Sequence, residues 1–298
     1  MTLPFAVPPG VPLGALRPAL AEHGALLFRG WGIGGLAEFQ EFVTLFSRTD
    51  VPFGYAGGAS PRRSLDEAGL YTSTEYPPEM TLALHNELSY AGVWPRTLFF
   101  HCVEAAPIGG ATTLGDSRRI LARLDPDVLG EFRAKGVRYV RNLSGTKGWG
   151  YSWQEAFETD DPAAAEAECR RIGADFEWSD DGTLRMSQVR PATAVHPVTG
   201  EEVWFNQADG FHPSALAPAV YDAMLAECGS EERFRLNSSF GDGTPIPREA
   251  LEHIRAVLRD ETRPHQWQPG DVIVLDNLLA AHGRAPFEGP RKIVLAMR

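Results

Sequence analysis

Short apolar or alternating runs, each bounded by glycine or proline, recur towards both ends of the chain and predict β-strands. The clearest of these runs are residues 24–30, 97–103, 137–142, 267–277 and 291–297. Two further segments have the pattern of hairpins, namely 176–186 with a turn at 180–182 and 196–206 with a turn at 199–200. This distribution of strands favours a mainly β protein.

Apolar residues at helical spacing fall between these strands. They predict helices over residues 12–23, 36–47, 117–135, 161–173, 216–227 and 248–260. Short strands with helices between them indicate a β-sandwich or jelly roll with helical insertions. No internal repeat or low-complexity linker divides the chain, so we expect residues 1–298 to form a single domain.

Residues 144–190 differ from this pattern. Here Trp149, Tyr151 and Trp153 alternate with small polar residues, and an acidic, alanine-rich helix follows. We expect an insertion that contributes a substrate pocket or its lid, with burial of these aromatic residues in the core as the alternative reading.

Composition narrows the class of protein. The 28 basic and 39 acidic residues give a net charge of −11, which argues against a protein that binds nucleic acid or an anionic membrane. The first 14 residues contain several prolines and no basic n-region, so we do not expect a signal peptide there. No apolar run is long enough for a membrane span. The three cysteines form no CxxC pair. We therefore expect a cytoplasmic protein with a small-molecule partner.

The segment LHNELSY, residues 84–90, follows an apolar run and alternates like a strand. Side chains two apart on a strand project to the same face, so His85 and Glu87 are expected to point together, away from Asn86. An imidazole beside a carboxylate supplies two ligands of a metal site. A second histidine would complete the two-histidine, one-carboxylate set that suits non-haem Fe(II).

His282 is the best candidate for that second histidine among the eight in the chain. It follows the strong strand 267–277 and lies between small residues, which leaves its imidazole free to face a cavity. Two further elements fit a co-substrate: GGATT (residues 109–113), which places hydroxyls after a flexible glycine pair, and Arg291 at the start of the last strand. A hydroxyl and a guanidinium facing one cavity would bind a carboxylate, as the distal carboxylate of 2-oxoglutarate requires.

Six segments together carry a family resemblance: LHNELSY, GGATTLGD, VWFNQ, GDGTPIP, PGDVIVLDN and HGRAPFEGPRK. From about residue 24 to the end, the chain resembles the taurine dioxygenase-like Fe(II)/2-oxoglutarate oxygenases. It is most similar to the subgroup that contains the syringomycin aspartyl β-hydroxylase and clavaminate synthase-like proteins.

The resemblance implies a double-stranded β-helix (jelly-roll) core and O2 as the second co-substrate. It also implies iron on His85, Glu87 and His282, and 2-oxoglutarate on Arg291 and Thr112, with Thr113 as the alternative. Related halogenases carry a small residue in place of the carboxylate, so Glu87 argues against halogenation.

The resemblance gives less guidance about the substrate, because the position four past Arg291, where relatives often carry a second arginine, is Leu295. An amino acid, free or bound to a peptide-synthetase carrier protein, is the expected substrate, hydroxylated at an unactivated C–H bond. The candidate substrate-binding residues are Glu75, Arg190, Trp204 and Asn206.

Several alternatives remain at this stage. The same site could carry out desaturation or epoxidation. A catabolic dioxygenase for a sulfonate or similar small acid is disfavoured by Leu295. A zinc hydrolase could use the same three ligands but would have no use for Thr112 and Arg291. A jelly-roll binding module would give no reason to gather the three ligands.

Overall fold

Two β-sheets packed against each other form the core of the molecule. In the computed structural model, residues 3–48, 50–54, 58–59, 64–65, 69–73, 76–146 and 151–298 are described. The larger sheet has the order β1 (Phe5–Val7), β2 (Ala25–Phe28), β15 (Val272–Asp276), β5 (Thr97–Glu104), β18 (Lys292–Met297) and β3 (Leu70–Thr72). The smaller has the order β14 (Arg263–His265), β7 (Thr112–Asp116), β16 (Ala280–Arg284) and β4 (Leu82–His85). Neighbouring strands are antiparallel except for β1 and β2, and the predicted jelly roll is confirmed.

The strands of the larger sheet are apolar at successive positions because alternate side chains pack into two different cores. In β18, Leu295 and Met297 face the core between the two sheets, whereas Val294 and Ala296 face a second core on the outer side. Helices α1 (Arg17–His23) and α2 (Leu36–Ser47) cover that outer side. The larger sheet is therefore buried on both faces, and its central strands are mostly apolar, with polar residues mainly at their ends.

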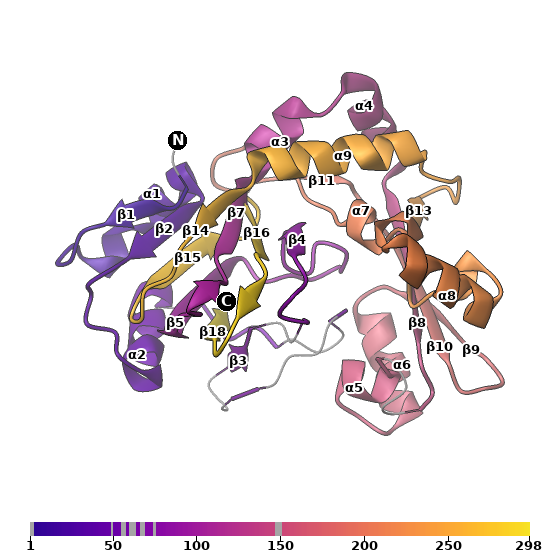
Figure 1. Cartoon of the computed structure of the whole chain (residues 1–298), viewed down its shortest axis with the longest axis horizontal. Coiled ribbons are helices and arrows are strands. Elements are labelled where there is room, and N and C mark those ends of the chain that lie inside the picture. Colours follow the sequence, from indigo (N-terminus) through magenta and orange to yellow (C-terminus); the bar gives the residue numbers. More distant parts are fainter. Residues whose placement is uncertain are drawn as a thin grey trace.

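A further four-stranded sheet lies beside the jelly roll, on the right of Figure 1. Its order is β13 (Leu236–Phe240), β8 (Val137–Leu143), β10 (Leu184–Arg190) and β9 (Asp175–Trp178), with α5 (Trp153–Phe157) and α6 (Pro162–Arg171) packed on it. Tyr151 and Trp153 are buried in the cluster beneath these helices, so in this structure they are core residues of the segment expected to be a lid. Trp149 lies outside the described residues.

The predicted helix 117–135 is two helices, α3 (Ser117–Arg123) and α4 (Pro126–Lys135). Asp125 caps α4 by accepting hydrogen bonds from the N–H groups of Asp127 and Val128, and Pro126 cannot continue α3. The long helix α9 (Arg248–Glu261) crosses the top of the molecule in Figure 1. The remaining elements are η1 (Leu13–Ala15), β6 (Ile108–Gly109), β11 (Thr193–Val195), β12 (Glu202–Trp204), α7 (Ala208–Phe211), η2 (Pro213–Ala215), α8 (Pro218–Cys228), η3 (Glu231–Arg233) and β17 (Phe287–Glu288).

Both predicted hairpins are present, as β9–β10 and β11–β12. Among the described residues, none of the helices has the length and apolar character needed to cross a bilayer.

Candidate active site

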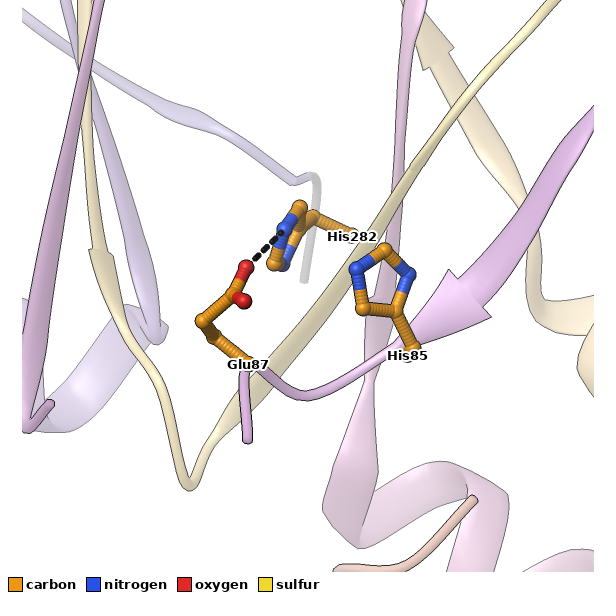
Figure 2. Close-up of side chains that lie close together, drawn as sticks. All are labelled: His85, Glu87 and His282. Atoms are coloured by element: carbon orange, nitrogen blue, oxygen red, sulfur yellow. Dashed lines mark ion pairs between the residues drawn. The ribbon is translucent and has the colours of Figure 1, made fainter. Parts of the chain in front are cut away.

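Three side chains from two strands and a turn converge in the smaller sheet (Figure 2). His85 is the last residue of β4, and His282 lies opposite it in the antiparallel partner β16. The expectation that Glu87 shares a strand with His85 was wrong, because β4 ends at His85 and Glu87 lies in the following turn. Leu88 has φ 55°, in the left-handed region, which turns the chain away from the strand direction.

The three side chains are close enough to share one metal ion. The His85 and His282 ring centroids are 4.4 Å apart, and His282 Nε2 lies 3.6 Å from Glu87 Oε2. One ligand atom from each residue lies within 4.8 Å of the others. Glu87 and His282 are buried, so water competes poorly for the ligand atoms.

The donor set fits Fe(II). Nδ1 of His85 donates to the Ala83 carbonyl oxygen at 2.9 Å, so Nε2 is the nitrogen with a lone pair for a metal. Nδ1 of His282 is buried and has no hydrogen-bond partner in the described part of the chain. Two imidazoles and a carboxylate on one face are the ligands of non-haem iron oxygenases.

A buried asparagine that the sequence did not reveal fixes the turn carrying Glu87. The Glu87 N–H donates to Asn277 Oδ1 at 2.7 Å, and Asn277 Nδ2 donates at 2.9 Å to the carbonyl oxygens of Glu87 and Pro95. Asn86 points away from the ligands, as expected, and donates to the Asn277 carbonyl oxygen at 2.7 Å. The end of the strong strand β15 thus anchors the metal-binding turn.

The glycine after His282 is required by close packing. A Cβ at Gly283 would lie 2.4 Å from the Leu82 carbonyl oxygen and 2.7 Å from Thr113 Oγ1. The sequence analysis predicted no strand in this segment, but it forms β16 between β7 and β4. The close approach of β4 brings His85 and His282 together.

A cavity beside the three ligands contains the residues predicted for 2-oxoglutarate. Its lining comprises Ser73, Leu82, Phe100, Thr112, His282, Gly283, Arg284, Arg291 and Ile293. Thr113 is not among these residues, because alternation along β7 points it to the other face. Thr112 Oγ1 accepts a hydrogen bond from Trp267 Nε1 at 2.9 Å.

Two guanidinium groups face this cavity. Arg291 lies just before β18, and its Nε donates to the Gly110 carbonyl oxygen at 3.0 Å. Burial, reinforced by the charge of Arg284, lowers the pKa of Arg291 to about 10. Arg284, which the sequence did not reveal, follows His282 by two positions on β16, and among the described residues it donates to the main-chain carbonyl oxygens of Tyr76, Pro77 and Met80. No ion pair within the described ranges neutralises either arginine, so the cavity favours an anion.

Three of the four predicted substrate-binding residues are described, and they lie away from this cavity. Arg190 Nη2 donates to the Ile172 carbonyl oxygen at 2.6 Å and to Gln188 Oε1 at 2.8 Å. Trp204 packs in the core with its ring centroid 5.2 Å from that of Phe132. Asn206 Nδ2 donates to the Ala192 carbonyl oxygen at 2.7 Å, and its Oδ1 accepts from the Ala208 N–H at 3.0 Å. None of the three lines the cavity beside the ligands, and Glu75 lies outside the described residues.

Comparison with known proteins gives a consistent set of relatives. The family model described as taurine catabolism dioxygenase TauD, TfdA family matches residues 9–297. The chain is 40% identical over 278 residues to the dapdiamide synthesis protein DdaC of Enterobacter agglomerans, covering 93% of this chain and 83% of that protein. It is 29% identical over 294 residues to a clavaminate synthase-like protein of Arabidopsis thaliana, covering 95% and 83%.

A solved structure shares the fold. PvcB of Pseudomonas aeruginosa matches with a TM-score of 0.54 at 15% identity, over 97% of this chain and 80% of that chain.

Proposed function

Because the chain belongs to the taurine catabolism dioxygenase TauD, TfdA family, we propose that it hydroxylates an unactivated C–H bond of an amino-acid-type substrate. The chain is an Fe(II)/2-oxoglutarate-dependent oxygenase, in keeping with the family and with the ligand set of His85, Glu87 and His282. The relationship to a dapdiamide synthesis protein supports a substrate from biosynthesis. A cytoplasmic location stays a prediction.

The observation that carries the proposal is the anion-binding cavity next to the three ligands. His85, Glu87 and His282 would hold the iron, while Arg291 and the Thr112 hydroxyl would bind the distal carboxylate of 2-oxoglutarate. When bound, the iron would activate O2, with 2-oxoglutarate giving up two electrons: one oxygen atom would enter the substrate as the hydroxyl group and the other would enter succinate, with release of CO2. The charge of Arg284 adds to the attraction for the anion, and burial of Arg291 strengthens the contact because water screens it less.

This cavity also weighs against two alternatives. A zinc hydrolase needs the three ligands and a water but gains nothing from two guanidinium groups beside them. A dioxygenase for a sulfonate-type small acid would need the second arginine of its relatives, whereas Leu295 is fully buried in the core between the sheets. Desaturation and epoxidation use the same residues, and identification of the product distinguishes them.

The test is an anaerobic titration of metal-free protein with Fe(II) and then 2-oxoglutarate. We expect a visible iron-to-2-oxo-acid charge-transfer band in the wild type and none in His85→Ala. Arg291→Ala leaves a carboxylate without its cation, which costs about 2–5 kcal/mol and weakens 2-oxoglutarate binding at least about 30-fold. Lys292→Ala is the matched control, because Lys292 is adjacent but exposed.

Amino acids are then screened in air for succinate release coupled to 2-oxoglutarate consumption, both free and loaded on a carrier protein. A wild-type protein that forms no band and retains zinc instead would contradict the oxygenase assignment.

A further inference from the structure

A glutamine that follows β12, outside the two sheets of the jelly roll, contacts the metal-binding turn. Gln207 Nε2 donates to the Asn86 carbonyl oxygen at 2.9 Å and to Ser89 Oγ at 3.1 Å. Asn86 and Ser89 lie on either side of Glu87 in the sequence. One amide group therefore bridges the short stretch of chain that presents the carboxylate ligand.

The orientation of this amide is fixed by its partners. A main-chain carbonyl oxygen can only accept a hydrogen bond, so the nitrogen of the Gln207 amide, and not its oxygen, must face Asn86. The amide nitrogen carries two hydrogens, and the two contacts with Asn86 and Ser89 use both of them. A side chain of the same length without this donor would lose both contacts.

The main chain around Gln207 is itself held by the sheet beside the jelly roll. The Gln207 N–H donates to Tyr139 Oη at 2.9 Å. At the next residue, Ser238 Oγ donates to the Ala208 carbonyl oxygen at 2.8 Å, and the Ala208 N–H donates to Asn206 Oδ1 at 3.0 Å. Tyr139 on β8 and Ser238 on β13 are paired across the two strands. The segment that carries Gln207 is therefore fixed to these strands.

The position of Glu87 explains why such contacts matter. His85 and His282 lie opposite each other on paired strands, whereas Glu87 lies past the end of β4, in a turn. Asn277 holds this turn from the jelly roll, and Gln207 holds it from the neighbouring sheet. Groups that orient a metal ligand typically change metal affinity by a factor of about 10–100.

We propose that Gln207 is a positioning residue of the iron site, which fixes the turn that presents Glu87 and so couples the sheet beside the jelly roll to the metal. The proposal rests on the oxygenase function and adds a residue to its metal centre. It also gives a role to the segment VWFNQ, residues 203–207, which carries part of the family resemblance. Gln207 does not line the cavity proposed for 2-oxoglutarate, so its effect should reach the metal and not the co-substrate anchor.

The test is a titration of metal-free protein with Co(II), whose visible absorption reports the geometry of its ligands. Gln207→Met keeps the length of the side chain and removes the donor. We expect this variant to bind Co(II) about tenfold or more weakly and to shift the absorption bands of the bound metal. Gln154→Met is the matched control, because Gln154 is also half-buried and its Nε2 donates to a carbonyl oxygen, that of Gly145, at 3.1 Å. The control should bind Co(II) with the affinity and spectrum of wild type.

Thermal unfolding of the metal-free proteins separates positioning from general stability. Gln207→Met and Gln154→Met should melt at similar temperatures, so that only the metal site distinguishes them. Ser89→Ala removes one of the two acceptors from the side of the turn. It should weaken Co(II) binding by a smaller factor, and in the Gln207→Met background it should have little further effect.

An unchanged Co(II) affinity and spectrum in Gln207→Met would refute the positioning role, as would an equal change in Gln154→Met. If Gln207→Met does not fold, Ser89→Ala decides, and wild-type affinity and spectrum in that variant would refute the role. The Co(II) titration does not depend on 2-oxoglutarate. A wild type that binds Co(II) but forms no charge-transfer band with Fe(II) and 2-oxoglutarate would therefore contradict the oxygenase function and leave the role of Gln207 to the Co(II) result.

Discussion

Replacing Trp267 with phenylalanine should weaken 2-oxoglutarate binding through Thr112. An indole N–H can only donate, so at 2.9 Å from the Thr112 oxygen it must be the donor. The Thr112 hydroxyl hydrogen is then left to point to an acceptor in the cavity, which is where a carboxylate oxygen would lie. His265 packs edge-on against the Trp267 ring, with centroids 5.0 Å apart, and holds the indole in place.

The size of the effect follows from the bonds involved. Trp267→Phe removes one neutral hydrogen bond, worth about 0.5–1.5 kcal/mol, so the dissociation constant for 2-oxoglutarate should rise about fivefold. Thr112→Ala removes a hydrogen bond to a charged group, worth about 1.5–3 kcal/mol, and should raise it about 10- to 150-fold. In the Thr112→Ala background, Trp267→Phe should have little further effect, because the group that it orients is gone.

The assay is the charge-transfer titration with 2-oxoglutarate and with 2-oxopentanoate, which has a methyl group in place of the distal carboxylate. Only 2-oxoglutarate binding should weaken in Trp267→Phe. Trp204→Phe is the matched control, because its indole nitrogen is also buried but has no hydrogen-bond partner among the described residues. Equal weakening of both 2-oxo acids, or none, would refute the orienting role of Trp267.

Three further substitutions test the support of the site and of the fold. Asn277→Ala should weaken Fe(II) binding about 10- to 100-fold, the range seen when groups that orient a metal ligand are removed, as measured by competition with a chelator. Gly283→Ala should push β4 away and lower both iron affinity and stability, the latter by about 1–3 kcal/mol in urea unfolding. Hydrogen bonds from Arg119 and Arg123 lower the pKa of Glu261 to about 2. The stabilisation is therefore present above the ordinary carboxyl pKa and fades as pH falls towards 2, so the stability difference between wild type and Glu261→Gln should narrow on acidification.

Much of the fold could be predicted from the sequence because the hydrophobic pattern is local. The runs at 97–103 and 291–297 became β5 and β18 with small shifts in their ends. β16 could not be predicted in this way, because Ala280, Ala281 and Gly283 have little strand preference of their own. They are extended because β7 pairs with all three of them, while β4 pairs with the intervening His282 and with Arg284 on the other side.

In the candidate site too, residues with a local sequence pattern could be predicted, whereas residues fixed by long-range contacts could not. His85, Glu87 and His282 were recognisable because metal ligands are few in kind and their spacing is informative. Asn277 contacts Glu87 across 190 positions of the chain, so no local pattern marks it. The same limit applies to the predicted substrate residues: Trp204 packs in the core and Asn206 hydrogen-bonds to Ala192, contacts that no local pattern reveals, and their role in substrate binding stays a prediction.

The position of β4 gives the metal a structural task. β4 is an outer strand of the smaller sheet, and it meets β16 at only two registered pairs separated by a bulge. An ion on His85 and His282 would cross-link that border, and through Glu87 it would also fasten the turn beyond it. Metal binding should therefore stabilise this edge of the sheet against local unfolding, and it should slow amide exchange and proteolysis along residues 82–90 even without substrate.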